Sequence, residues 1–170
     1  GDVMFKKPNT DEAQAKLAAL DRSLAIIEFT MDGVIITANR NFLNVVGYTL
    51  EEIKGKNHKI FCDPAYAGGP AYETFWRGLR GGEYASGEFM RFGKGGKSVW
   101  LEATYNPILA ANGKPERVIK FASDITAKKN ETARLETMID GMPVAVMTAD
   151  PKHELTTTYF NTTSHTTPAP

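Results

Sequence analysis

The chain has 170 residues, 42% of them hydrophobic, which is enough for one domain of ordinary size with additional segments. Its 20 basic and 20 acidic side chains cancel, and this balance argues against nucleic acid or an anionic membrane surface as a partner. The single cysteine, Cys62, excludes an internal disulfide and a cysteine zinc cluster, and the lack of a long apolar run or a signal-peptide pattern predicts a cytoplasmic location.

The first third of the chain predicts a helix, a hairpin and two short helices. Asn9, three positions before Glu12, begins an amphipathic helix with a capping-box pattern. Asp32-Gly33 joins two apolar runs, and this dipeptide supplies the positive φ angle of a tight hairpin. The expected elements are a leader over residues 1–23 with its helix at 9–23, strands at 24–29 and 34–37, and short helices from Phe42 to Gly47 and from Thr49 to Gly55.

The middle of the chain predicts one longer helix followed by a meander of strands. A loop with Pro64, Gly68 and Pro70 leads to this helix, on which Phe75 and Trp76 share one face with Leu79. Glycine-rich turns separate the strands that follow, so we expect them to pair antiparallel in sequence order. The expected ranges are a helix at 71–79, strands at 86–92, 98–109 and 117–123, and a linker over 127–142 within a helix at 126–140.

The C-terminal segment repeats the start of the domain. An apolar run at 144–149, a turn with an aspartate and a second run at 155–160 echo the predicted hairpin at 24–37. We therefore interpret residues 143–170 as the truncated start of a second, similar domain. Strands with unpaired edges are unfavourable alone, so we expect these two to be disordered or to join another sheet, including one of a second chain.

The order of elements and the local motifs over residues 24–126 resemble PAS sensory domains. The first motif is Asn41-Phe42 followed by Gly47-Tyr48-Thr49 and Gly55. The second comprises the glycine-rich turn at 93–96, Trp100, Tyr105-Asn106-Pro107-Ile108 and the segment Phe121 to Thr126. The resemblance implies an α+β fold, with a five-stranded antiparallel sheet, short helices on one face and flanking helices at both ends.

Within that family, the stretches at 58–62, 75–76 and 99–108 are similar to the tandem PAS domains of bacterial methyl-accepting chemotaxis proteins of the aerotaxis type. This implies a sensor of redox state, oxygen or a small ligand that signals through its flanking helices. It also implies a homodimer, a second PAS domain and an output domain in the full-length protein. The alternative is a cofactor-free module for dimerisation or protein interaction in a histidine kinase or another signalling protein.

His58 is the residue on which a haem assignment depends. Several PAS sensors hold haem through a histidine in the helical segment that faces the sheet, so the resemblance makes His58 the candidate iron ligand, and a metal ligand only if haem is bound. The alternative is a loop histidine that bonds to nearby backbone. His58 also stands where light-oxygen-voltage photoreceptors carry their reactive cysteine, so we expect no flavin adduct. Cys62, four residues on, is interpreted as a small buried thiol.

A flavin assignment depends on Trp76 and its surroundings, which resemble the flavin-binding PAS domains of aerotaxis receptors and of a nitrogen-fixation redox regulator. Arg91 and Phe92 depart from that pattern, because those domains carry asparagine in this region. The cofactor is therefore left open between FAD, haem and none, since aromatic side chains also fill ordinary cores. The candidate cofactor-binding residues are His58, Trp76, Asn57, Arg91, Trp100 and Tyr105.

Asp124 and Thr126 lie where the last predicted strand meets the following helix, and we expect them to couple the domain to that helix. No catalytic pattern stands out. The glycine-rich segment at 93–96 lacks the context of a phosphate-binding loop, and Glu51 and Glu52 fit the first turn of a helix. We therefore expect no enzymatic activity.

Overall fold

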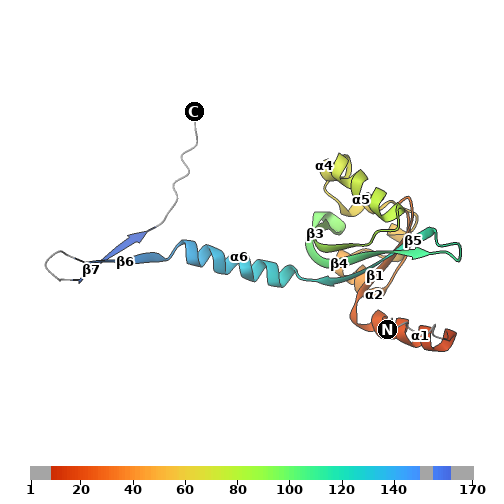
Figure 1. Ribbon diagram of the computed structural model, residues 1–170, viewed down its shortest axis with the longest axis horizontal. Coiled ribbons are helices and arrows are strands. Elements are labelled where there is room, and N and C mark those ends of the chain that lie inside the picture. The colour runs from red at the N-terminus through yellow and green to blue at the C-terminus, as the bar shows by residue number, and fades with distance from the viewer. Residues whose placement is uncertain (1–8, 150–154, 162–170) are drawn as a thin grey trace, which may run out of the picture. The chain divides into compact units, whose positions relative to one another are not determined.

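The computed structural model describes residues 9–149 and 155–161, and Figure 1 shows the arrangement of the elements. Its contacts divide the chain into two units, residues 1–126 and residues 127–170. The first unit contains α1 (Thr10–Ser23), β1 (Ala25–Thr30), β2 (Ile35–Ala38), α2 (Arg40–Val46), α3 (Leu50–Ile53), the 3-10 helix η1 (His58–Phe61), α4 (Pro64–Ala67), α5 (Pro70–Arg80), β3 (Ala85–Phe92), the 3-10 helix η2 (Lys94–Gly96), β4 (Ser98–Leu109) and β5 (Pro115–Asp124).

The five strands of the first unit form one antiparallel sheet in the order β2-β1-β5-β4-β3. This order places β5 in the centre, because the hairpin β1-β2 and the meander β3-β4-β5 meet between β1 and β5. Figure 1 shows α4 and α5 on one side of the strands. The α+β arrangement expected from the sequence is confirmed.

Alternation along the central strands explains which face of the sheet is buried. Every second residue from Ala25 to Phe29 and from Val99 to Tyr105 is buried, while the residues between them are at least partly exposed. The helices cover the buried face with apolar side chains, including Phe42, Val46, Ile53, Phe61, Tyr72, Trp76 and Leu79. The result is one core between the sheet and the short helices.

The predicted helix caps and turns form as expected. The side chain of Asn9 accepts a hydrogen bond from the backbone N–H of Glu12 at 2.7 Å, and Thr49 with Glu52 makes both bonds of a capping box. Gly33 has a φ angle of 81°, which the hairpin between β1 and β2 requires. Each of these signals is local in the sequence, which is why it could be read directly.

Two short helices lie in the segment that the sequence analysis interpreted as a loop. Asn57 caps η1 and Asp63 caps α4, where Pro64 occupies the first turn. Aspartate followed by proline is a helix-start signal, so α4 could have been recognised. On α5, the face buried in the core carries Tyr72 with Trp76 and Leu79, whereas Phe75 is only partly buried.

The second unit contains α6 (Thr126–Asp140), which begins at its boundary, followed by β6 (Pro143–Ala149) and β7 (Leu155–Asn161). The two strands pair antiparallel with each other, from Pro143 opposite Asn161 to Ala149 opposite Leu155. The two strands therefore form the hairpin that the repeat of residues 24–37 indicated, and the expectation that they join another sheet stays a prediction. The turn predicted between the two strands falls on residues 150–154, and these residues and 162–170 lie outside the described part of the chain. Among the helices of the described chain, none combines the length and hydrophobicity needed to cross a bilayer.

Candidate sensory site in the core

Three polar or charged side chains are buried in the core of the described chain. His58 of η1 is 0% exposed, Arg91 of β3 is 5% exposed, and Lys120 of β5 is 2% exposed. All three contact Tyr105 of β4, which is itself fully buried. Four separate elements therefore bring one polar cluster together, and we call these four residues the core network.

His58 lies between two tyrosine hydroxyls. Its Nδ1 atom is 3.1 Å from the hydroxyl of Tyr72, and its Nε2 atom is 3.1 Å from the hydroxyl of Tyr105. Burial lowers the pKa of His58 well below its ordinary value of 6.5, and the positive charges of Lys120 and Arg91 lower it further. A neutral imidazole donates from one nitrogen and accepts at the other, so one tyrosine accepts from the ring and the other donates to it.

The position of His58 is fixed from several directions. Its backbone N–H donates to the carbonyl of Gly33 at 2.8 Å, and its ring meets Phe29 and Trp76 edge to face at centroid distances of 5.2 Å and 5.5 Å. The side chain bonds to tyrosine hydroxyls and not to the nearby backbone that the sequence analysis gave as the alternative. His58 is therefore a core residue held by aromatic packing.

Arg91 and Lys120 approach Tyr105 in different ways. Arg91 donates from Nη2 to the Tyr105 hydroxyl at 3.3 Å and from Nη1 to the carbonyl of Met90 at 3.0 Å. The ammonium of Lys120 lies 4.7 Å from the centroid of the Tyr105 ring. Burial lowers the pKa of Lys120 well below its ordinary value, and the charge of Arg91 adds to this; burial also raises the pKa of Tyr105 to about 12.

The six candidate cofactor-binding residues separate into two groups. His58, Trp76, Arg91 and Tyr105 face the core together. Trp100 lies on the opposite face of β4 from Tyr105, because the two are an odd number of residues apart on one strand. Asn57 caps η1 and donates from its side chain to the carbonyl of Asp32 at 2.9 Å. Trp100 and Asn57 therefore lie apart from the core network, and the cofactor-binding role of all six residues stays a prediction.

Cys62 adjoins the core network without completing a reactive pair. Its sulfur lies 3.6 Å from Nδ1 of His58, and that nitrogen also faces the Tyr72 hydroxyl. Burial raises the pKa of Cys62, which keeps the thiol protonated. The geometry matches the interpretation of Cys62 as a small buried thiol.

The core as it stands does not fit haem ligation through His58. Both ring nitrogens already face tyrosine hydroxyls, and aromatic side chains enclose the ring. An iron ligand would have to give up one of these bonds. Arg91 likewise offers only donors, so it cannot supply the paired donor and acceptor of the asparagine found in the similar flavin-binding domains.

Asp124 and Thr126 connect the end of β5 to β4. One carboxylate oxygen of Asp124 accepts from the Thr126 backbone N–H at 2.9 Å and from its hydroxyl at 2.6 Å. The same hydroxyl oxygen accepts from the backbone N–H of Trp100 at 2.9 Å, and the N–H of Ile125 donates to the Trp100 carbonyl at 2.9 Å. The two predicted coupling residues therefore hold the strand-to-helix junction against β4.

Comparison with known proteins identifies the fold family. A family model described as the PAS fold matches residues 35–122, which is more than half of the chain. The chain belongs to the PAS fold family. Its PAS domain is thus a sensory, signalling type of domain, as the sequence motifs indicated.

Three relatives show how far the likeness extends. The Biofilm dispersion protein BdlA of Pseudomonas aeruginosa is 50% identical over 115 residues, covering 68% of this chain and 28% of that protein. The crystal structure of a PAS domain from Colwellia psychrerythraea has a TM-score of 0.60 at 24% identity, covering 69% of this chain and 99% of that one. An RNA-binding light-oxygen-voltage receptor has a TM-score of 0.61 at 22% identity, covering 81% of this chain and 41% of that one. The two structural likenesses show the fold alone.

Two members of the site were missed by the sequence analysis. Lys120 lies between Val118 and Ala122, so alternation along β5 places it on the buried face. Tyr72 precedes Trp76 by four residues and therefore shares its helical face. Lys120 could have been found by continuing the alternation of buried positions along β5. Tyr72 could have been found by continuing the spacing of buried positions along α5.

Proposed function

We propose that residues 24–126 form a sensory PAS domain whose input acts on the core network and whose output leaves through the junction at Asp124 and Thr126. The observation that carries the proposal is the hydrogen-bonded path from Arg91 through Tyr105 to His58 inside an otherwise apolar core. The input is a redox change, oxygen or a small ligand. The change then reaches the helix at 126–140.

The cost of burying the core network supports a functional role. Buried cations without a carboxylate partner are unfavourable, and well-packed apolar residues of similar size stabilise a core at least as well. The core network therefore contributes little stability beyond what well-packed apolar side chains would contribute. A polar network with two alternative hydrogen-bond arrangements is the kind of element that a signal can bias.

Strand β4 provides the route from the core network to the junction. It carries Tyr105, the centre of the core network, and Trp100, whose backbone bonds to both Ile125 and Thr126. A shift of Tyr105 along or across the sheet changes the strand that holds the start of α6. The coupling needs about 1–3 kcal/mol, which two or three such hydrogen bonds can provide.

Replacement of Asp124 tests this route. Asp124→Ala removes the acceptor of the Thr126 N–H and hydroxyl, so we expect amide hydrogen exchange of Thr126 and Trp100 to become at least about tenfold faster. Glu116→Ala, on the same strand at an exposed position, is the matched control and should leave both rates unchanged. Equal exchange in Asp124→Ala and the parent chain would remove the junction from the proposal.

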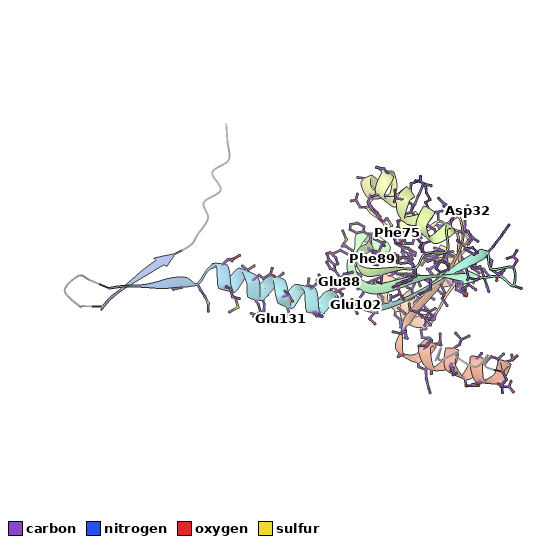
Figure 2. All side chains as sticks on the ribbon, viewed as in Figure 1. Asp32, Phe75, Glu88, Phe89, Glu102 and Glu131 are labelled. Atoms are coloured by element: carbon purple, nitrogen blue, oxygen red, sulfur yellow. The ribbon has the colours of Figure 1, made fainter. Side chains whose placement is uncertain are left out.

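A second candidate function is an interaction module that forms a homodimer. A hollow of about 480 Å³ lies against the sheet, lined by Leu24 with residues of β3, β4 and β5, and α1 exposes Leu17 and Leu20. Glu88 and Glu102 lie opposite each other on β3 and β4 within this hollow (Figure 2), which weakens it as an apolar contact. A colourless monomer–dimer equilibrium that Leu20→Glu abolishes, with no effect of any ligand, would favour this function.

The wider setting is also part of the proposal. A cytoplasmic chemoreceptor with a second PAS domain and an output domain accommodates this chain, which spans less than a third of BdlA. We propose that the domain acts without catalytic turnover and without binding nucleic acid or membrane. The core residues fit neither haem through His58 nor flavin through Arg91, and the visible absorption spectrum of freshly purified protein tests both cofactors directly.

A further inference from the structure

The core of the described chain contains two basic side chains and no acidic one. Arg91 and Lys120 are buried, whereas no aspartate or glutamate is buried in the described part of the chain. Buried charges in proteins are ordinarily paired with an opposite charge or with a ligand. The partners of these two basic side chains are a tyrosine hydroxyl, a backbone carbonyl and aromatic rings, all of which are neutral.

Arg91 has a donor to spare and borders a hollow beside β3. Its Nε atom is buried and has no hydrogen-bond partner among the described residues, and its guanidinium lies 5.0 Å from the ring centroid of Phe89. The residue lines a hollow of about 330 Å³ beside β3, together with Tyr66, Phe89, Met90, Trp100, Asp63 and Glu88. This volume falls in the range of about 300–1,000 Å³ that small-molecule sites occupy. Figure 2 shows Phe89 beside Phe75, where the aromatic wall begins.

We propose that this PAS domain binds a small organic acid, whose carboxylate enters from the hollow beside β3 and pairs with the guanidinium of Arg91. The planar guanidinium matches a carboxylate with two parallel hydrogen bonds, and the free Nε supplies one of them. The organic part packs against Tyr66 and Phe89. This inference rests on the proposed sensory function and names its ligand class.

The surroundings of the hollow favour a single carboxylate over phosphate. Asp63 and Glu88 line the same hollow, so an anion with two charges is repelled more strongly than one with a single charge. One oxygen of Asp63, Oδ1, already accepts two backbone bonds from the first turn of α4, which fixes that charge in place. An apolar, aromatic wall also penalises a doubly charged ligand more than a monoanion.

Binding would act directly on the core network. Arg91 donates to the Tyr105 hydroxyl, and that hydroxyl also faces Nε2 of His58. A carboxylate competes for the guanidinium and weakens its bond to Tyr105. The Tyr105 hydroxyl then forms its stronger bond with His58, which shifts the strand that leads to Trp100 and the junction.

The test is titration of the purified chain with sodium acetate, propionate and benzoate, with benzamide and inorganic phosphate as the comparison probes, at constant ionic strength. Trp100 lines the hollow and Trp76 lies in the core, so tryptophan fluorescence reports binding and calorimetry confirms it. We expect a saturable change with at least one carboxylate and none with benzamide. Arg91→Gln should weaken that binding by at least about tenfold, while Arg77→Gln at an exposed position should not.

The outcomes separate this inference from the proposed function. Arg91→Lys keeps the charge without the planar guanidinium and should bind the carboxylate with intermediate affinity. This variant replaces Arg91→Gln in the test if Arg91→Gln does not fold. Failure of all three carboxylates, or binding of phosphate alone, would overturn the ligand class. In that case a haem or flavin spectrum, together with faster exchange at the junction in Asp124→Ala, would leave the sensory function standing. Carboxylate binding that Arg91→Gln leaves intact would overturn the assigned site.

Discussion

Gly93→Ala should reduce the free energy of unfolding of the PAS unit by about 3 kcal/mol. A Cβ atom at Gly93 would lie 2.5 Å from the carbonyl oxygen of Val46 and 3.1 Å from both its carbonyl carbon and its Cα. All three atoms belong to the backbone, so no side-chain rotation relieves the contact. The end of α2 must move away from the start of η2, and this displaces the buried Val46 and Phe42.

Gly87→Ala provides the control for this substitution. Gly87 lies within β3, the strand that ends one residue before Gly93, and a Cβ atom there would meet only the ring of Phe89, at an ordinary 3.6 Å. We expect a change within about 0.5 kcal/mol, since alanine also favours the strand slightly over glycine. Urea unfolding followed by tryptophan fluorescence measures both variants. Equal stability of the two would show that α2 and the end of β3 do not pack as described.

The second large effect is a pH dependence of stability that His58 imposes. The folded chain holds His58 neutral because burial lowers its pKa well below 6.5, whereas the unfolded chain protonates it below about that pH. The contribution of His58 to the free energy of unfolding is therefore fully present above about pH 6.5. It is lost as the pH falls, because the unfolded chain then binds a proton at His58 that the folded chain does not bind. From about pH 7.5 to about pH 5, this one group should lower the free energy of unfolding by about 2 kcal/mol.

The comparison with His58→Gln isolates this contribution. Glutamine does not titrate, so the variant should lose about 2 kcal/mol less than the parent over the same range, whatever its stability at neutral pH. Burial raises the pKa of Tyr72, Tyr105 and Cys62, and Arg91 stays charged, so none of these groups titrates in this range. Burial lowers the pKa of Lys120, but both proteins carry Lys120, so its own pH dependence cancels in the difference. Parallel pH profiles would mean that His58 is protonated in the folded protein.

Elements with local signals could be predicted from the sequence, and the site required the three-dimensional arrangement. The cap at Asn9, the turn at Gly33 and the alternation along β4 each depend on residues close in the chain. The contact of His58 with Tyr105 spans 47 residues and joins η1 to β4, two elements that meet only in the folded domain. No local periodicity in the sequence predicts the contact between His58 and Tyr105.

Counting odd and even positions along a strand predicts which candidate residues face the core. Trp100 and Tyr105 are both candidate cofactor-binding residues in the sequence, but residues an odd number apart on one strand face opposite sides of a sheet, so only Tyr105 faces the core. Lys120 was left out because a lysine is rarely buried, even though it continues the inward positions of β5. A buried lysine that interrupts an apolar face is thus a stronger signal for a functional core than an aromatic residue that fits it.

The central claim is that the core network communicates with the junction through β4, and amide hydrogen exchange in Tyr105→Phe tests it most directly. This variant removes the hydroxyl that His58 and Arg91 share, and it keeps the ring that fills the core. We predict at least about tenfold faster exchange at the amides of Trp100 and Ile125, with no change in Tyr84→Phe, where the ring is 72% exposed. Unchanged exchange at both amides, alongside altered exchange near His58, would contradict the account.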